Sequence, residues 1–180
     1  KDLKIIYLLL TIALLSSSCS QSYFEQEKAD IDSLVIAYQK LTLNIKEIAI
    51  EEAKDHLKTY KESIDLIKKK TNPKKMPSME SAKFIDAFRS IKKTFKKLPK
   101  KQKELQRKIN INTKQLENLI LDINNDLLSN EELEKIITQE NEMFNEINRN
   151  YLKITKEIQK EKANLDSLLK ILPTEIEKLK

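Results

Sequence analysis

The chain has 180 residues and contains no glycine and no tryptophan, with one cysteine and one histidine. Sites that depend on glycine, such as phosphate-binding loops, dinucleotide fingerprints and nucleophile elbows, are therefore excluded. One histidine and one cysteine cannot build a His/Cys zinc site. Charged residues make up 34% of the chain and aromatic residues 6%, a balance that favours long solvated helices over a compact enzyme core.

Residues 1–18 have the layout of a secretory signal peptide. Lys1 and Lys4 precede an apolar run over residues 5–15, which only Thr11 interrupts and which three serines follow. With about 11 residues, this run is too short to cross a bilayer as a helix, which takes about 20. The segment therefore predicts export of the protein.

The only cysteine, Cys19, directly follows Ser16, Ser17 and Ser18. This order resembles a bacterial lipobox, although Leu15 lies one residue further from the cysteine than the usual box places its leucine. The resemblance implies that Cys19 is the acylated first residue of the mature protein, with residues 19–23 as the tether. Two or more fatty chains would hold the protein stably on its membrane, whereas one holds it only marginally. The other interpretation is a plain signal peptide cleaved elsewhere, with Cys19 as a free thiol.

The first predicted helix covers about residues 24–70. From Ile31 to Ile67 apolar residues recur at steps of three and four, and no proline interrupts the pattern before Pro73. Residues 71–78, which contain two prolines, are expected to form a loop.

Two further helices are predicted over about residues 79–128 and 130–172. Ser78 can cap the first of them, and Ser129 with Glu132 has the spacing of a capping box for the second. Pro99 either kinks the middle helix or starts a new one. Pro173 is expected to end the last helix, leaving residues 173–180 as a short C-terminal tail.

These three helices have similar lengths and short connections. We therefore expect an all-α fold, an elongated antiparallel three-helix bundle over residues 24–172 with a Pro-kinked middle helix. A four-helix bundle is the alternative if Pro99 breaks that helix. Because the apolar spacing varies between seven-residue and 3.6-residue patterns, a long coiled coil of identical chains is a second alternative.

No group of residues in the sequence points to catalysis. His56 lies beside Leu57 at the edge of the apolar stripe, where a lone histidine is more often a boundary residue than a base. Tyr38, Tyr60 and Tyr151 fall at stripe positions, which suits core packing better than ligand stacking. We expect no enzymatic activity, no cofactor and no metal site.

The strongest asymmetry in the sequence is its charge. Residues 66–108 hold 16 Lys+Arg against 3 Asp+Glu, whereas residues 19–65 and 109–180 each have a net charge of −4. Lysine pairs recur every four residues on the middle helix, at Lys92, Lys93, Lys96, Lys97, Lys100 and Lys101. Like charges at this spacing destabilise a helix by about 0.2–0.5 kcal/mol per pair.

Two interpretations of the lysine pairs stay open. They can form a solvated face opposite Phe88, or a docking surface for a polyanion such as a sulfated glycosaminoglycan or an acidic protein. Nucleic acid is not expected as a partner, because no groove-reading motif is present.

The surroundings of Cys19, the glycine-free composition rich in Lys, Ile and Asn, and the predicted all-helical mature region together resemble the small surface lipoproteins of Borrelia-type spirochaetes. This resemblance implies a protein anchored in the outer membrane, exposed at the cell surface, that binds host matrix, plasminogen or complement proteins. Such a host-interaction role would use the basic middle helix or the C-terminal Lys180. The alternative is a structural or assembly lipoprotein whose helices pair with a bacterial partner or with a second copy.

Overall fold

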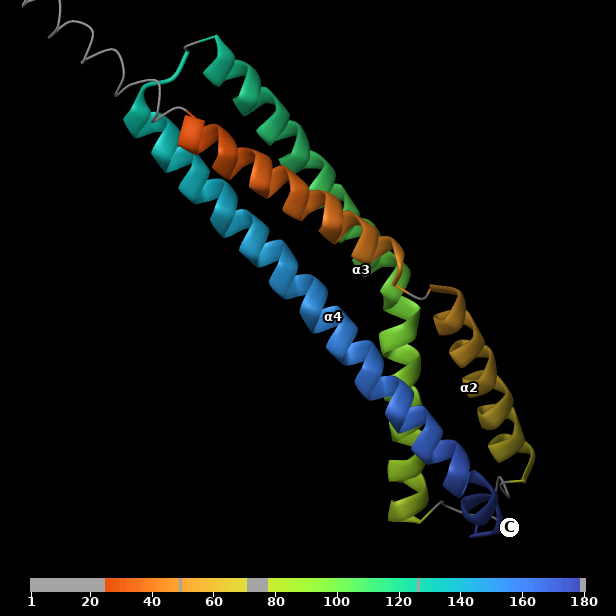
Figure 1. Ribbon diagram of the computed structural model, residues 1–180. Coiled ribbons are helices and arrows are strands. Elements are labelled where there is room, and N and C mark those ends of the chain that lie inside the picture. The colour runs from red at the N-terminus through yellow and green to blue at the C-terminus, as the bar shows by residue number, and fades with distance from the viewer. Residues whose placement is uncertain (1–24, 49, 71–77, 126, 179–180) are drawn as a thin grey trace, which may run out of the picture. The chain divides into compact units, whose positions relative to one another are not determined.

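Helices are the only regular secondary structure in the part of the chain that the computed structural model describes, which is residues 25–48, 50–70, 78–125 and 127–178 (Figure 1). A helix over residues 25–46 is followed by α2 (Ile50–Lys70), α3 (Met79–Asn124) and α4 (Asn130–Lys178). The all-helical prediction is confirmed.

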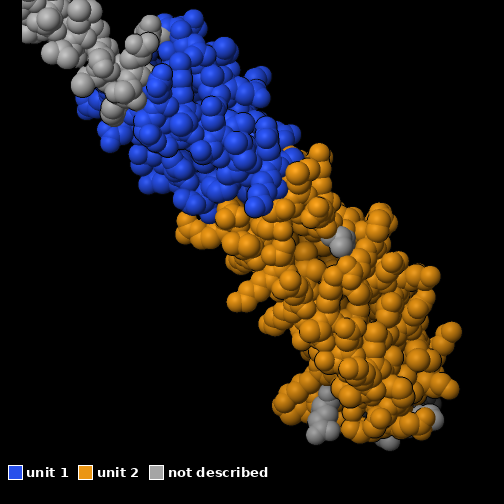
Figure 2. Space-filling model, in the orientation of Figure 1, with its two compact units in different colours: residues 1–42, 108–147 blue, residues 43–107, 148–180 orange. Residues whose placement is uncertain are grey.

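The chain divides into two compact units, which Figure 2 shows in different colours. Unit 1 consists of residues 1–42 and 108–147, and unit 2 of residues 43–107 and 148–180. In unit 1, the hydroxyl of Tyr38 on the first helix accepts a hydrogen bond from Asn112 of α3, and the Tyr38 ring packs against Phe144 of α4. Three helical segments therefore share the core of unit 1.

Unit 2 is also a packing of helical segments. Two ring pairs join α2 to α3, His56 with Phe95 and Tyr60 with Phe88. Because the earlier residue of α2 meets the later residue of α3, these two helices run antiparallel. An ion pair between Glu52 and Lys162 joins α2 to α4.

The buried residues of α3 follow an unbroken alternation of three-residue and four-residue steps. The half-buried Gln102 occupies one position of this stripe, and the others are Ser81, Phe84, Phe88, Ile91, Phe95, Leu98, Leu105, Ile109, Asn112, Leu116, Leu119 and Ile123. This is a seven-residue repeat, the pattern that keeps one side of a helix against its neighbours over many turns. The spacing of the buried residues was expected to vary between seven-residue and 3.6-residue patterns, but on α3 it keeps the seven-residue pattern throughout.

The predicted single helix over residues 24–70 was wrong, because the first helix ends at residue 46, Glu47 and Ile48 are not helical, and α2 begins at Ile50. Up to Ile48 its buried residues alternate three-residue and four-residue steps, but the step from Ile48 to Ala53 is five. One extra residue would turn the buried stripe by about 100° on a continuous helix. The interruption returns Ala53 to the buried side. Gln102 of α3 donates its side-chain amide to the Ile45 carbonyl (2.8 Å), in the last turn before the interruption.

Neither internal proline ends its helix. The alternative of four helices separated at Pro99 was wrong, because α3 continues through Pro99. The extra helical piece arises earlier, because Glu47 and Ile48 are not helical and α2 begins at Ile50. The expected helix end at Pro173 was also wrong, since residues 173–178 belong to α4. Leu172 and Ile176 are buried on either side of Pro173, and their packing offsets the cost of about 3 kcal/mol that an internal proline carries. The kink at Pro99 stays a prediction.

Both predicted helix caps are confirmed. The Ser81 amide donates to the Ser78 hydroxyl oxygen (3.2 Å) at the start of α3. Ser129 donates its hydroxyl (2.6 Å) and its amide (3.0 Å) to the Glu132 carboxylate, and these bonds hold the pKa of Glu132 below its usual value. The predicted end of α3 was late, because the helix stops at Asn124 and Leu127 is 66% exposed.

A polar contact interrupts the apolar core of unit 1. The Asn112 side-chain amide donates to the Tyr38 hydroxyl (2.9 Å), with both side chains buried. The Phe144 ring packs edge-on against the Tyr38 ring, with centroids 5.1 Å apart. Burial raises the pKa of Tyr38, against a smaller lowering by Asn112. Nearby, burial raises the pKa of Glu140 on α4, and one of its carboxylate oxygens is buried without a hydrogen-bond partner.

We expect Asn112→Leu to lower the free energy of unfolding by about 1–3 kcal/mol, because it leaves the buried Tyr38 hydroxyl without a partner. Combining it with Tyr38→Phe should cost less than the two single changes added together, since the double variant leaves no polar group unpaired. Urea denaturation of the four chains measures this coupling. Strictly additive losses would show that the contact contributes nothing of its own.

We expect Glu140→Gln to stabilise the protein at pH 7 more than at pH 4. Because the pKa of Glu140 is raised in the folded state, the unfolded chain ionises first. The wild type therefore loses stability as the pH rises from the ordinary carboxyl pKa to the raised one. The variant lacks this loss. Thermal unfolding at both pH values measures the difference, with Glu142→Gln at an exposed position as the control. The same gain at both pH values would contradict the prediction.

Candidate functional site

The lysines predicted as a binding surface lie on the part of α3 that belongs to unit 2. Phe88, Ile91, Phe95 and Leu98 fill the buried side of this segment. The lysine side chains therefore occupy the remaining surface of the helix. The structure does not gather all six on one face.

Lys92 and Lys101 lie at the flanks of α3 and contact the neighbouring helices. The Lys92 ammonium is 5.3 Å from the centroid of the Tyr60 ring on α2, a cation–π contact. Lys101 is only 34% exposed and pairs with Glu157 of α4, with 2.5 Å between Nζ and Oε2. Both lysines therefore already have partners inside unit 2.

The other four lysines point into solvent. Among the residues that the structure describes, no acidic side chain pairs with Lys93, Lys96 or Lys97. Lys100 has an acidic neighbour, Glu104, but their charged atoms are 3.9 Å apart and the Lys100 side chain is 80% exposed. An exposed pair with this geometry contributes at most about 1 kcal/mol and leaves Lys100 open to other anions.

Two further cations extend this surface and were missed in the sequence. Lys103 and Arg107 are exposed on the next turns of α3 and have no acidic partner in the described part of the chain. Neither belongs to a lysine pair that repeats every four residues, which is why the pattern of pairs did not include them. A different sequence pattern would have found both residues. They continue an alternation of three-residue and four-residue steps between cations that starts at Lys93.

We call these five cations the basic row, and its members are Lys93, Lys96, Lys100, Lys103 and Arg107. Its steps of three, four, three and four residues repeat the spacing of the buried stripe on the other side of α3. A row with that spacing runs straight along a helix that follows a seven-residue repeat. Lys97 lies beside the row.

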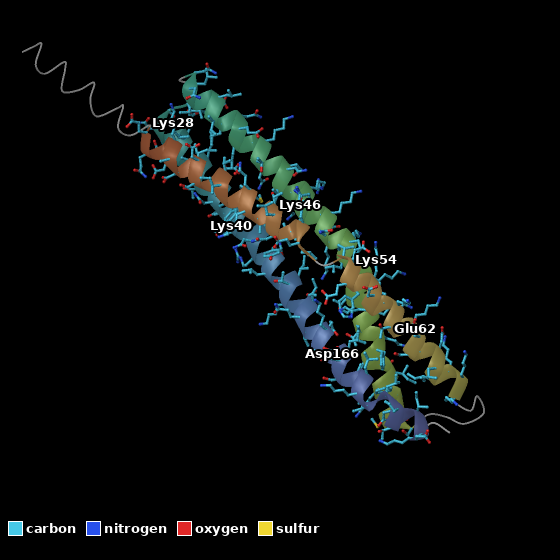
Figure 3. All side chains as sticks on the ribbon, turned by 45° about the vertical axis from the view of Figure 1, so that its right-hand side comes forward. Lys28, Lys40, Lys46, Lys54, Glu62 and Asp166 are labelled. Carbon is cyan, nitrogen blue, oxygen red and sulfur yellow. The ribbon has the colours of Figure 1, made fainter. Side chains whose placement is uncertain are left out.

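The two units carry opposite net charges. Residues 25–42 and 108–147 in unit 1 hold 5 Lys+Arg and 13 Asp+Glu, a net charge of −8. Residues 43–107 and 148–180 in unit 2 hold 27 Lys+Arg and 14 Asp+Glu, a net charge of +13. Charged side chains cover the helices in Figure 3, where Lys54 and Glu62 mark exposed positions on α2. The basic row therefore lies within the positive unit.

A groove of about 250 Å³ lies beside the helix interruption in unit 2. Its walls are Asn44, Glu47, Ile48, Tyr151, Thr155, Ile158, Gln159 and Lys162. Lys162 is the cation of this groove, and it pairs with Glu52, whose pKa is lowered mainly by the hydrogen bond from Lys162. The groove therefore has no unpaired cation with which to hold an anionic ligand.

His56 lies between the core and the surface of unit 2, as predicted. Its side chain is 20% exposed, its Nε2 is 3.5 Å from a Glu52 carboxylate oxygen, and its ring packs against Phe95 with centroids 5.0 Å apart. This is the position of a boundary residue that covers the core.

Cys19 and Lys180 lie outside the described residues. In the ranges that the structure does describe, no group of three or more His, Cys, Asp or Glu side chains could hold a metal ion. None of the helices there is long and apolar enough to pass through a membrane.

Comparison of the chain with protein-family models, with curated proteins and with solved structures gave no match. The evidence for function is therefore the geometry of the chain itself, and its strongest element is the unpaired positive charge on α3.

Proposed function

We propose that the protein is a lipid-anchored bacterial surface protein that binds a host polyanion through the solvent-facing side of α3. The observation that carries the proposal is the absence of acidic partners for Lys93, Lys96 and Lys97 among the described residues. Repulsion between these lysines works against the helix that holds them. An anionic ligand would remove that repulsion, so the arrangement is better suited to a bound polyanion than to water alone.

The ligand that we favour is a sulfated glycosaminoglycan of the host matrix. Binding of such a chain releases condensed counterions, which provides affinity without a shaped pocket. The solvent-facing side of α3 presents a row of exposed cations, which agrees with this mode of binding. Plasminogen or a complement protein would need an acidic surface of matching shape, and nothing on α3 selects for one.

The anchor and the location are part of the same proposal. Acylated Cys19 would hold the protein on the outer membrane at the cell surface, where a host polyanion is within reach. This part depends on the signal-like residues 1–18 and on the resemblance to spirochaetal lipoproteins.

For the architecture, we propose the elongated antiparallel three-helix bundle expected from the sequence, in which the helix over residues 25–46 and α2 together take the place of the first helix. The antiparallel contacts of α2 with α3 in unit 2 support it.

We expect the purified chain to bind heparin, and we expect the fourfold variant Lys93→Gln, Lys96→Gln, Lys97→Gln and Lys100→Gln to bind at least about tenfold more weakly, since a cation near an anionic surface contributes about 1 kcal/mol. Elution from immobilised heparin in a salt gradient measures the change.

The matched control removes four exposed lysines of α4 in the same unit, Lys153, Lys156, Lys160 and Lys170, also by change to Gln. It has the same net charge as the test variant. If both variants elute at the same salt concentration, net charge alone explains the binding and α3 is only a solvated face.

We expect a fatty-acid analogue to label the wild type in growing cells and to leave Cys19→Ser unlabelled, because a thioether-linked lipid requires the thiol of that residue. Gel fluorescence after metabolic labelling measures this, and equal labelling of both chains would exclude Cys19 as the anchor. Loss of the wild-type protein when intact cells are treated with protease would separate surface display from a periplasmic position.

A further inference from the structure

The basic row lies on one continuous helix and is long enough to follow one extended chain. From Lys93 to Arg107 there are 14 residue steps along α3, which is about 21 Å at 1.5 Å per residue. Neighbouring cations are separated along the axis by about 4.5 or 6 Å. Positive charge therefore recurs about every 5 Å along a single line.

Packing on the other side of α3 holds this line in place. Phe95, Leu98 and Leu105, which lie between members of the row in sequence, are all buried in the core. Pro99 sits between Lys96 and Lys100 without ending the helix. The backbone that carries the row is therefore ordered before any ligand arrives, which lowers the entropic cost of binding.

The row is also narrow. Lys92 on one flank contacts the Tyr60 ring, and Lys101 on the other flank is paired with Glu157. Before the row begins, Arg89 is paired with Asp86, with 2.8 Å between the charged atoms. The solvent-facing positive charge of this segment thus lies along the row, with Lys97 beside it, and a compact anion could reach only two or three members of the row at once.

The surroundings of the row favour a carbohydrate over a single-stranded nucleic acid. Proteins that bind single strands without sequence preference stack the bases on aromatic side chains. The segment from Lys93 to Arg107 has one aromatic residue, Phe95, which is 1% exposed. The surface therefore offers charge contacts and no platform for a base.

From these observations we infer that the basic row is a track for an extended sulfated polysaccharide that lies along the axis of α3 and contacts Lys93, Lys96, Lys100, Lys103 and Arg107 together. This inference depends on the proposed function and adds the direction, the length and the linear form of the ligand. Affinity should rise with the length of the polysaccharide until it spans the row, about 21 Å, and should change little beyond that length.

Size-fractionated heparin oligosaccharides, titrated against the full chain by calorimetry at several salt concentrations, test this. For the wild type we expect a steep gain in affinity up to the length that spans the row, followed by a plateau. Sucrose octasulfate, a compact molecule of high charge, should bind much more weakly than an oligosaccharide with the same number of sulfates. A single-stranded DNA of equal charge should also bind more weakly.

The variant Lys103→Gln with Arg107→Gln shortens the row to the segment from Lys93 to Lys100. We expect its plateau at a shorter oligosaccharide and a slope of log affinity against log salt that is smaller by about two, one for each cation removed. The control variant Lys153→Gln with Lys156→Gln on α4 should keep the plateau and the slope of the wild type. Circular dichroism of each variant verifies that it remains helical.

The possible failures can be told apart. If the wild type does not bind long heparin, the proposed function is wrong. If it binds long heparin but shows equal affinity for the shortest fragments or for sucrose octasulfate, the polyanion site stands and the track is wrong. Tighter binding of the single-stranded DNA would replace the polysaccharide with nucleic acid as the ligand.

Discussion

The spacing of buried residues in steps of three and four is the constraint on which the other features of this protein depend. On α3 it continues from Ser81 to Ile123, so one side of a long helix stays in contact with its neighbours. The opposite side then faces solvent over the same length. Exposed side chains that repeat in steps of three and four residues therefore form a row along that side. The five cations from Lys93 to Arg107 use this property, because their alignment comes from the core and not from contacts with one another.

Much of the fold could be predicted from the sequence because the apolar stripes and the caps are local signals. Ser78 and the pair Ser129 and Glu132 begin their helices as expected. The end of the first helix at residue 46 could not be predicted in the same way. Ile48 and Ala53 each fit a helical stripe, and only the step between them is one residue too long. The helix end expected at Pro173 was wrong for another reason. The cost of a proline inside a helix is visible in the sequence, whereas the burial of Leu172 and Ile176 that offsets it is not.

The sequence singled out the basic segment of α3, and the structure shows which of its cations face solvent and which contact other helices. Proximity in sequence grouped Lys92 and Lys101 with the solvent-facing lysines. In the structure, Lys92 contacts the Tyr60 ring on α2, and Lys101 is paired with Glu157 on α4. The separation of charge between the units was hidden for a related reason. Each unit combines two distant stretches of chain. A count along the sequence therefore shows a basic middle with two mildly acidic flanks, and not the −8 of residues 25–42 and 108–147 beside the +13 of unit 2.

A strict seven-residue repeat also creates an ambiguity that the polar contact in unit 1 resolves. Sliding α3 by seven residues along its neighbours would again place apolar residues opposite apolar residues, so hydrophobic packing hardly distinguishes the two alignments. Such a slide would bring Leu119 to the place of Asn112 and leave the hydroxyl of Tyr38 facing a hydrocarbon side chain. The hydrogen bond between Asn112 and Tyr38, set among the apolar residues of unit 1, thus favours a single axial position of α3 against its neighbours.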